Sequence, residues 1–592
     1  MSAKHLTASR PEPAVGSEPR RRRVASGVLV GAAYVGLALL VMRHFLADPD
    51  GRVSAHLPVD HTWFEWLLSH GAYSLRHLEN PLFSTRQNTP VGVNMMANTS
   101  VLGVTLPLAP VTMLLGPRIA YLVWMTGALA GTAMATYWVL HRHGRYSRPG
   151  ALLAGAFAGF APGVVHHANG QPNFVSNFAL PFIVLAVVRL GATGRSVRDG
   201  IVLGLLVTYQ LFINEELLLI TAAAGAVIVV ACAAHRPGEA RLRARSFLTA
   251  LAVTALTAGM LCAYPIWFQF HGPGTFRGMP TYHTWGEDLL TYLTMPRDTL
   301  GGDAEAETTQ GLIEQNTWYG WPVVLLAVVA VVLLWRRSLR VRIAAVVAVV
   351  FAILSFGPAL RIGGTVTDIP APWAYIPDDL PVLGLLMPSR LTYAVTAAIA
   401  LIIAAFWDAV ASRRIDRRMT AAARALIAAA LLPLLPTALP AVDDQRPPRF
   451  ITSGAWRPYV PPGRTLIPVP LPSSYPGRDS LSWSAEALHE FPVPEGYFLG
   501  PDANGAGFAG PTTLSYTTRL VNDTLRTGTV PAVTDQTRAA VWADVTHWRG
   551  SVVVLRAAEG NEPLRALLEQ VFGSAEQHLD VWVWDLRGRT GV

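Results

Sequence analysis

Apolar and polar positions alternate on the scale of whole helices along most of this chain. Between about residues 24 and 441, long apolar runs are separated by short polar turns, and a helix of about 20 apolar residues crosses a bilayer. The pattern predicts about eleven spans, at about residues 24–42, 118–140, 149–165, 174–190, 199–213, 217–234, 247–268, 321–336, 341–359, 391–411 and 422–441. We therefore expect a mainly α-helical fold, a polytopic transmembrane helical bundle.

One apolar segment, Val101–Leu115, does not fit the pattern of spans. It is short, it contains Pro107 and Pro110, and Gly116 and Pro117 follow it at once. If it crossed the membrane, the basic turn that ends near residue 148 would face outside. We interpret it as a re-entrant or interfacial piece, and a spanning segment remains the alternative.

Composition and charge support a membrane protein. Hydrophobic residues make up 51% of the 592 positions and charged residues 15%, whereas soluble domains carry about 25% charged residues. The formal net charge is +8. Arginines gather where apolar runs end: Arg20–Arg23, Arg142, Arg145, Arg148, Arg195, Arg198, Arg236, Arg241, Arg243, Arg245, Arg336, Arg337, Arg340, Arg342, Arg413, Arg414, Arg417 and Arg418. This positive-inside pattern predicts a multi-pass protein of the cell membrane with a cytoplasmic N-terminus, and it explains the charge without nucleic acid as a partner.

The two ends of the chain differ from the middle. Residues 1–23 are rich in Pro, Glu and Ser and end in arginines, which predicts a disordered, basic, cytoplasmic segment. Residues 24–441 form the expected transmembrane domain, with a large first external loop at 43–117. Residues 442–592 carry β-like runs at 465–469, 551–555 and 581–584 and an amphipathic helix at about 563–572. We expect a small α/β extracytoplasmic domain there.

The first external loop contains an acid in an aromatic setting. Asp60 is followed by Trp63, Phe64, Glu65 and Trp66. A carboxylate outside the membrane can act as a general base on a hydroxyl group, and the aromatic rings can hold a sugar or a lipid. Alternatives stay open, because an acid at this place can also cap an interfacial helix and tryptophans anchor helices at the membrane surface.

Three further groups carry candidate chemistry. His166 and His167 end a predicted span and can hydrogen-bond a phosphate or a sugar, or form a polar cap. Glu215 and Glu216 lie between two tightly joined spans, where acids need water or a partner. Arg390 lies at a predicted outer helix start, where it needs either a lipid phosphate or a structural carboxylate. The sequence indicates no metal site and no cofactor, and Cys232 and Cys262 lie inside apolar runs.

With these motifs the layout resembles the C-type glycosyltransferase (GT-C) superfamily, in particular its bacterial branch. The matching features are Asp60, Glu79-Asn80-Pro81-Leu82-Phe83, Pro90-Val91-Gly92-Val93-Asn94, Asn98-Thr99-Ser100, Trp318-Tyr319-Gly320 and Pro388-Ser389-Arg390. The resemblance covers about residues 24–441. It implies a polyprenyl-phosphate sugar donor, transfer on the outer face of the membrane, and a carboxylate of the first loop as base. The chain departs from many members in having His61, not a second acid, after Asp60.

Taken with the resemblance, these residues predict an inverting hexosyl- or pentosyltransferase. Asp60 would be the catalytic base, and the acceptor would be a glycan or lipid of the cell envelope. Arg390 would stabilise the departing lipid phosphate, with His166 or His167 as a further candidate for the same role. The predicted substrate-binding residues are Glu65, His166, His167, Arg390, Trp63 and Trp66. A lipid or polysaccharide transporter and a non-catalytic envelope scaffold are the alternative functions.

Overall fold

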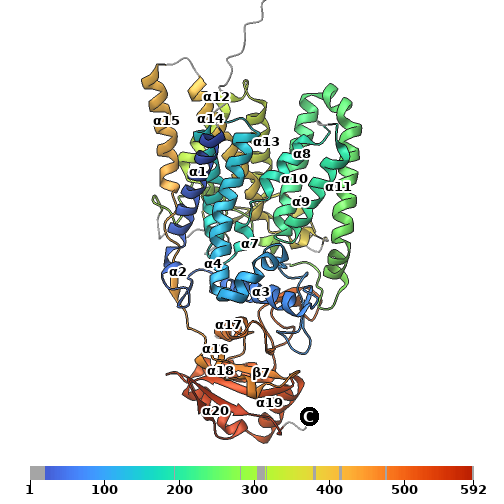
Figure 1. The fold of residues 1–592 in the computed structure, drawn as a ribbon, viewed down its shortest axis with the longest axis vertical. Helices are drawn as coiled ribbons and strands as arrows, with labels where there is room; N and C mark the ends of the chain where they lie inside the picture. The colour runs from blue at the N-terminus through green and yellow to red at the C-terminus, as the bar shows by residue number, and fades with distance from the viewer. Residues whose placement is uncertain are drawn as a thin grey trace, which may run out of the picture.

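The computed structural model describes most of the chain and is mainly helical. The described residues are 20–191, 194–279, 282–302, 314, 316–377, 380, 382–412, 416–473 and 477–589. The segment expected to be disordered is 1–23. Its residues 1–19 lie outside the described residues, whereas residues 20–23 differ from the expectation and form the start of the first helix, Arg20–Val41. Arg413 and Arg414 also lie outside the described residues. A helical part and a C-terminal part lie at opposite ends of the long axis (Figure 1).

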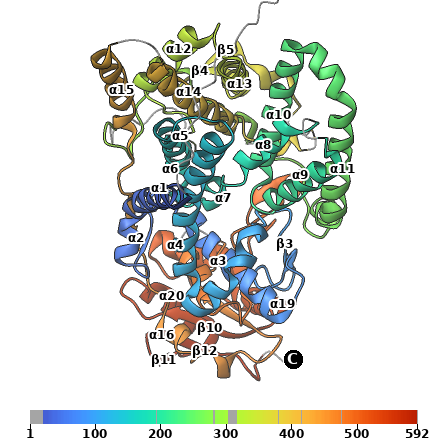
Figure 2. The same cartoon turned by 45° about the horizontal axis from the view of Figure 1, so that its top comes forward.

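The helical part contains fifteen α-helices among the described residues. They are α1 (Arg20–Val41), α2 (Arg43–Ala47), α3 (Pro58–His77), α4 (Leu102–Arg142), α5 (Arg148–Phe160), α6 (Pro162–His167), α7 (Pro172–Val175), α8 (Leu180–Arg189), α9 (Ser196–Leu211), α10 (Glu215–His235), α11 (Pro237–His271), α12 (Trp321–Leu334), α13 (Leu339–Leu354), α14 (Thr392–Ser412) and α15 (Arg417–Leu431). Helices α8–α11 form one group, α12–α15 another, and α4 and α5 lie between them (Figure 2).

Short antiparallel strand pairs connect these helices. They are β1 (Arg52–Ser54) with β6 (Ala441–Asp443), β2 (Phe83–Ser84) with β3 (Val93–Asn94), and β4 (Ala359–Ile362) with β5 (Thr365–Pro370). The first of these pairs is long-range, because it joins the first predicted external loop to the start of the C-terminal part.

Five helices are long and apolar enough to cross a membrane, so the count of about eleven spans is not confirmed. Within the described residues these candidates are Val24–Val41, Leu102–Arg142, Glu215–His235, Pro237–His271 and Pro388–Ala411. Other apolar runs give shorter helices. The run predicted at 149–165 is divided where α5 ends before Pro162, because proline lacks the backbone N–H that continues a helix.

Helix α4 begins inside the ambiguous segment Val101–Leu115 and contains it from Leu102 onward. Its 41 residues would extend over about 60 Å, twice the hydrocarbon thickness. The helix is broken at Gly116, which has φ 84° and ψ 165°, a conformation that suits glycine and is followed by Pro117. The segment is therefore helical but set off from the rest of α4, and its re-entrant placement stays a prediction.

Small residues bring the central helices close together. A Cβ atom on Gly159 of α5 would lie 2.6 Å from the Cβ of Ala133 on α4. Gly155 is similarly close to the backbone of the same residue, at 2.6 Å from its carbonyl oxygen. Such close approaches of two helix backbones are typical of packing within membranes. There the hydrophobic effect does not drive helices together, and small residues allow the close van der Waals contact that does.

The C-terminal part is built on a four-stranded sheet with the order β11-β12-β10-β7. Its elements are α16 (Arg449–Thr452), β7 (Thr465–Val469), α17 (Arg478–Glu486), β8 (Leu499–Pro501), β9 (Gly507–Ala509), α18 (Tyr516–Thr527), α19 (Asp535–His547), β10 (Gly550–Arg556), α20 (Glu562–Phe572), β11 (Glu576–His578) and β12 (Val581–Asp585). The predicted strands near 465, 551 and 581 and the helix near 563 are confirmed.

The central strand β10 is buried on both sides. Val553 and Leu555 belong to a core with α19 and α20, whereas Val552 and Val554 belong to a second core on the other face. Successive side chains of a strand point to opposite faces, so an uninterrupted apolar run fits a strand covered on both sides.

Candidate functional site

A cavity of about 650 Å³ lies where the helical part meets the C-terminal part. It is walled by α3, α7 and the ends of α9, α10 and α11, and it is closed on one side by residues that precede β8. Polar side chains occupy part of the wall: Asp60, Asn98, Thr99, Ser100, Gln171, Asn173, Asn214, Glu215, Glu216, Gln269, Tyr282, Arg390 and Tyr497.

Asp60 lies in the first turn of α3, where the helix dipole favours a negative charge. One carboxylate oxygen accepts a hydrogen bond from Nε2 of Gln171 at 2.6 Å, and the other accepts one from the hydroxyl of Tyr497 at 2.7 Å. The residue at the N-cap position is Leu57, and Asp60 makes no capping contact. Its carboxylate is therefore held by two donors in the cavity wall, and it does not cap the helix.

Tyr497 belongs to the C-terminal part of the chain and completes this arrangement. Its ring packs edge-on against Trp63 at 6.2 Å between centroids. The charge of Asp60, together with burial, raises the pKa of Tyr497 well above its ordinary value, so the hydroxyl remains a hydrogen-bond donor. The hydroxyl thus holds the carboxylate across 437 positions of sequence.

A line of hydrogen bonds leads from Asp60 deeper into the protein. Gln171 contacts Nδ1 of His167 through Oε1 at 2.6 Å, and Nε2 of the same ring contacts Oδ1 of Asn316 at 2.6 Å. The amide of Asn316 in turn donates to Glu314 at 2.6 Å. Burial lowers the pKa of His167, while Glu314 and the two amides act in the opposite direction. This line fixes the amide group that holds Asp60.

Arg390 forms the far end of that line and is itself buried. Its guanidinium donates to Glu216 at 2.6 Å and to Glu314 at 2.6 Å, and it lies over the ring of Phe174 at 4.2 Å. Burial raises the pKa of Glu314, but the charge of Arg390 and the hydrogen bonds from Arg390 and Asn316 outweigh it and hold that pKa below its usual range. The structural carboxylate partner, one of the two alternatives for Arg390, is thus present, and contact with a lipid phosphate stays a prediction.

Amide groups add polar atoms to the cavity wall. Nδ2 of Asn214 and Oδ1 of Asn173 are buried and have no hydrogen-bond partner among the described residues. Asn98 donates to the carbonyl of Leu499 at 2.9 Å and accepts from its amide at 2.6 Å. Such groups match the hydroxyl groups of a sugar, which both donate and accept. The two hydrogen bonds between Asn98 and Leu499 also join the first loop to the C-terminal part.

The structure brings only some of the predicted site residues into the cavity. Asp60, Trp63 and Arg390 line it. Glu65 is buried elsewhere on α3, 3.3 Å from His61.

Trp66 and the two histidines also lie outside this cavity wall. Trp66 is fully buried, stacked on Trp63 at 5.1 Å and packed on His489 at 4.2 Å, so it is a core residue and not a surface anchor. His167 supports Gln171 from behind. His166 lines a separate, very small cavity beside Asp298.

Sequence reasoning did not single out Tyr497 or Glu314 for the site. No motif surrounds either residue, and both reach the site only through long-range packing. Gln171 could have been predicted from the sequence. It stands four positions after His167, a spacing at which two side chains of a helical turn approach each other. Within the described residues, no group of three or more His, Cys, Asp or Glu side chains is placed to hold a metal ion.

A comparison with models of protein families agrees with the resemblance in the sequence. Residues 102–360 match the model of glycosyltransferase family 87, so the resemblance to GT-C membrane glycosyltransferases is confirmed. No curated protein sequence matches the chain.

Among solved structures, the chain is similar to the oligosaccharyltransferase of Archaeoglobus fulgidus in the apo form, with 13% identity, a TM-score of 0.49, and 94% of this chain and 72% of that one covered. It is also similar to the archaeal oligosaccharyltransferase AglB from Archaeoglobus fulgidus in complex with an inhibitory peptide and a dolichol-phosphate. That match has 12% identity, a TM-score of 0.47 and coverage of 93% and 72%.

Proposed function

Because residues 102–360 match a family of membrane glycosyltransferases, we propose that this chain transfers a sugar from a polyprenyl-phosphate-linked donor to a glycan or lipid of the cell envelope. The observation that carries the proposal is the position of Asp60. Its carboxylate stands in the wall of a cavity of about 650 Å³ and is oriented by Gln171 and Tyr497. A carboxylate oriented in this way suits a general base.

The proposed reaction is a single displacement. Asp60 takes the proton of an acceptor hydroxyl, whose oxygen forms a bond to the anomeric carbon of the donor sugar. The bond between that carbon and the phosphate oxygen breaks on the opposite side, and the electron pair leaves with the polyprenyl phosphate. The configuration of the anomeric carbon is inverted. Asp60 is the catalytic residue of this step, and Gln171 and Tyr497 are positioning residues.

The composition of the cavity wall supports a donor with a lipid tail. Leu211, Leu218, Leu219, Ile266 and Phe270 form an apolar side on α9, α10 and α11, and the amides and acids form the polar side. An isoprenoid chain matches the first side and a sugar the second. The departing phosphate would approach Arg390. The positive charge of Arg390 is already neutralised by its two carboxylate partners, Glu216 and Glu314.

The proposed topology has a cytoplasmic N-terminus and an external C-terminal domain. The positive-inside pattern supports the orientation. The pairing of β1 with β6, and the contact of Tyr497 with Asp60, support a common side for the first loop and the C-terminal domain. Transfer would then take place on the outer face.

The test is sugar transfer by the full chain in lipid nanodiscs from a panel of polyprenyl-phosphate sugars, with products identified by mass spectrometry. Asp60→Asn keeps the shape of the side chain and removes the base. Asp50→Asn is the matched control, because Asp50 is an exposed acid of the same loop outside the cavity. We expect transfer by the wild type and the control and none by Asp60→Asn.

Other outcomes overturn parts of the proposal. Equal transfer by all three proteins would remove Asp60 from the role of base. No transfer by a folded wild type with any donor would favour a transporter or an envelope scaffold, which predict that Asp60 can be replaced without effect on folding or assembly.

A further inference from the structure

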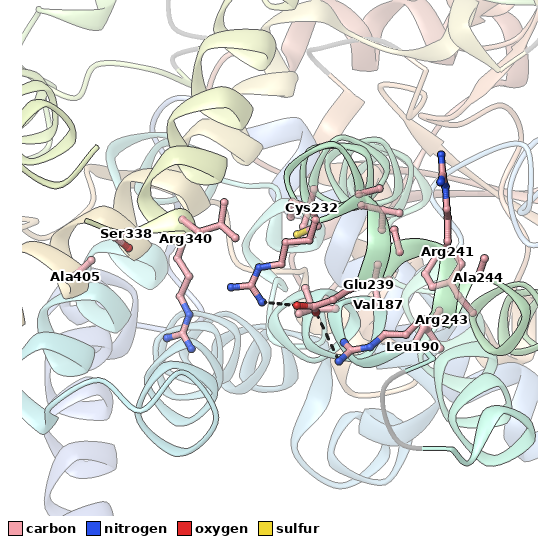
Figure 3. Close-up of a pocket in the computed structure, with 18 of the residues that line it drawn as sticks. Val187, Leu190, Cys232, Glu239, Arg241, Arg243, Ala244, Ser338, Arg340 and Ala405 are labelled. Atoms are coloured by element: carbon pink, nitrogen blue, oxygen red, sulfur yellow. Dashed lines mark hydrogen bonds and ion pairs between the residues drawn. The ribbon is translucent and has the colours of Figure 1, made fainter. Parts of the chain in front are cut away.

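A second, larger cavity lies near the ends of α10 and α11 that are farther from Asp60. Its volume is about 1120 Å³, and it is bounded by α8, the last turns of α10, the first turns of α11 and the turn between α12 and α13 (Figure 3). It shares no lining residue with the cavity that contains Asp60. Helix α10 contributes Glu215 to the first cavity and Val229 to the second, which places them about 20 Å apart along this helix.

The inner wall of this second cavity is apolar. Val187 comes from α8, Ile228 and Val229 from α10, Phe247 from α11, and Leu334 from α12. Several such side chains remain partly exposed, although the helices on both sides pack against their neighbours. An apolar groove between helices in a membrane is filled by lipid chains unless protein covers it.

The rim of the cavity is basic. Five arginines line it, namely Arg236, Arg241, Arg243, Arg337 and Arg340, and all are exposed. A single acid, Glu239, accompanies them and pairs with Arg236 at 3.2 Å and with Arg243 at 3.8 Å. One carboxylate cannot neutralise five guanidinium groups, so the rim keeps an excess of positive charge. In Figure 3 Arg340 and Arg243 lie on opposite sides of Glu239.

We propose that this cavity binds one anionic phospholipid, with its acyl chains along the apolar wall and its phosphate at the arginine rim. Both halves of the cavity match this ligand. Arginine binds phosphate through paired hydrogen bonds, and a basic pocket between membrane helices attracts lipids with anionic head groups. The volume exceeds the about 300–1,000 Å³ of ordinary small-molecule pockets, which suits a lipid with two chains. A free anion would leave the apolar wall uncovered.

The test is native mass spectrometry of the full chain released from detergent, with phosphatidylglycerol and phosphatidylcholine of identical acyl chains. Arg243→Gln with Arg337→Gln removes two rim charges and retains much of each side chain. Arg417→Gln with Arg418→Gln is the matched control, since these exposed arginines begin α15 outside the cavity. We expect the wild type and the control to retain phosphatidylglycerol preferentially. The rim variant should bind it about thirty-fold more weakly, about fivefold for each arginine.

A second variant tests the apolar half. Ala233→Phe narrows the cavity from α10 without changing its charge, and we expect it also to weaken lipid retention. Equal retention of both lipids by the wild type would overturn the proposal, and so would equal losses in the rim variant and its control. Displacement of the lipid by millimolar inorganic phosphate would instead assign the arginines to a free anion and overturn it.

Discussion

Tyr497→Phe removes one hydrogen-bond donor from the carboxylate of Asp60, the proposed base, and leaves the aromatic ring in place. The hydroxyl donates to Asp60 at 2.7 Å, and the ring packs on Trp63 without using that hydroxyl. A hydrogen bond to a charged group contributes about 1.5–3 kcal/mol. If the bond orients Asp60 in the transition state, its loss lowers kcat by about 10–150-fold, while Gln171 still holds the other oxygen.

The assay is steady-state sugar transfer in nanodiscs with the donor identified by the panel. A positioning role predicts a fall in kcat with little change in KM for the donor. Tyr459→Phe is the control, because Tyr459 contacts His578 inside the C-terminal domain and does not line the cavity. An unchanged kcat for Tyr497→Phe would refute the reasoning, and so would an equal fall in both variants.

Three further predictions concern stability, each read from thermal unfolding in detergent. Arg390→Ala leaves Glu216 and Glu314 as buried unpaired carboxylates and should lower the free energy of unfolding by about 3–5 kcal/mol; an unchanged midpoint would contradict this. Because the pKa of Glu314 is lowered in the folded state, its stabilisation is present above the unfolded value of about 4.3 and is lost as the pH falls through the folded value. The advantage of the wild type over Glu314→Gln should therefore disappear in acid, and a constant difference would refute it. Gly159→Ala puts a Cβ 2.8 Å from a backbone nitrogen of α4 and should destabilise by about 1–3 kcal/mol, whereas Gly225→Ala, with 3.7 Å to its nearest atom, should not.

The sequence by itself determined the class of the protein and the character of its C-terminal domain. Long apolar runs with arginines at their ends indicate membrane spans. This signal depends only on local composition, so it can be read from the sequence. Likewise, β10 and α20 were predictable from short-range periodicity. The number of spans was not predictable, because Pro162 divides one apolar run and Gly116 breaks α4 into two helical segments, and hydropathy reports neither break.

The acid of the site was predictable and most of its surroundings were not. Asp60 stood out as an acid among aromatic residues in the first predicted external loop. Its partners Gln171 and Tyr497, and the partners of Arg390, meet it only after helices and the C-terminal domain have packed. Side-chain periodicity carries information over a few turns of helix, whereas a contact between positions 60 and 497 depends on the packing of whole elements. Only the tertiary structure decides which of several plausible polar residues share one cavity.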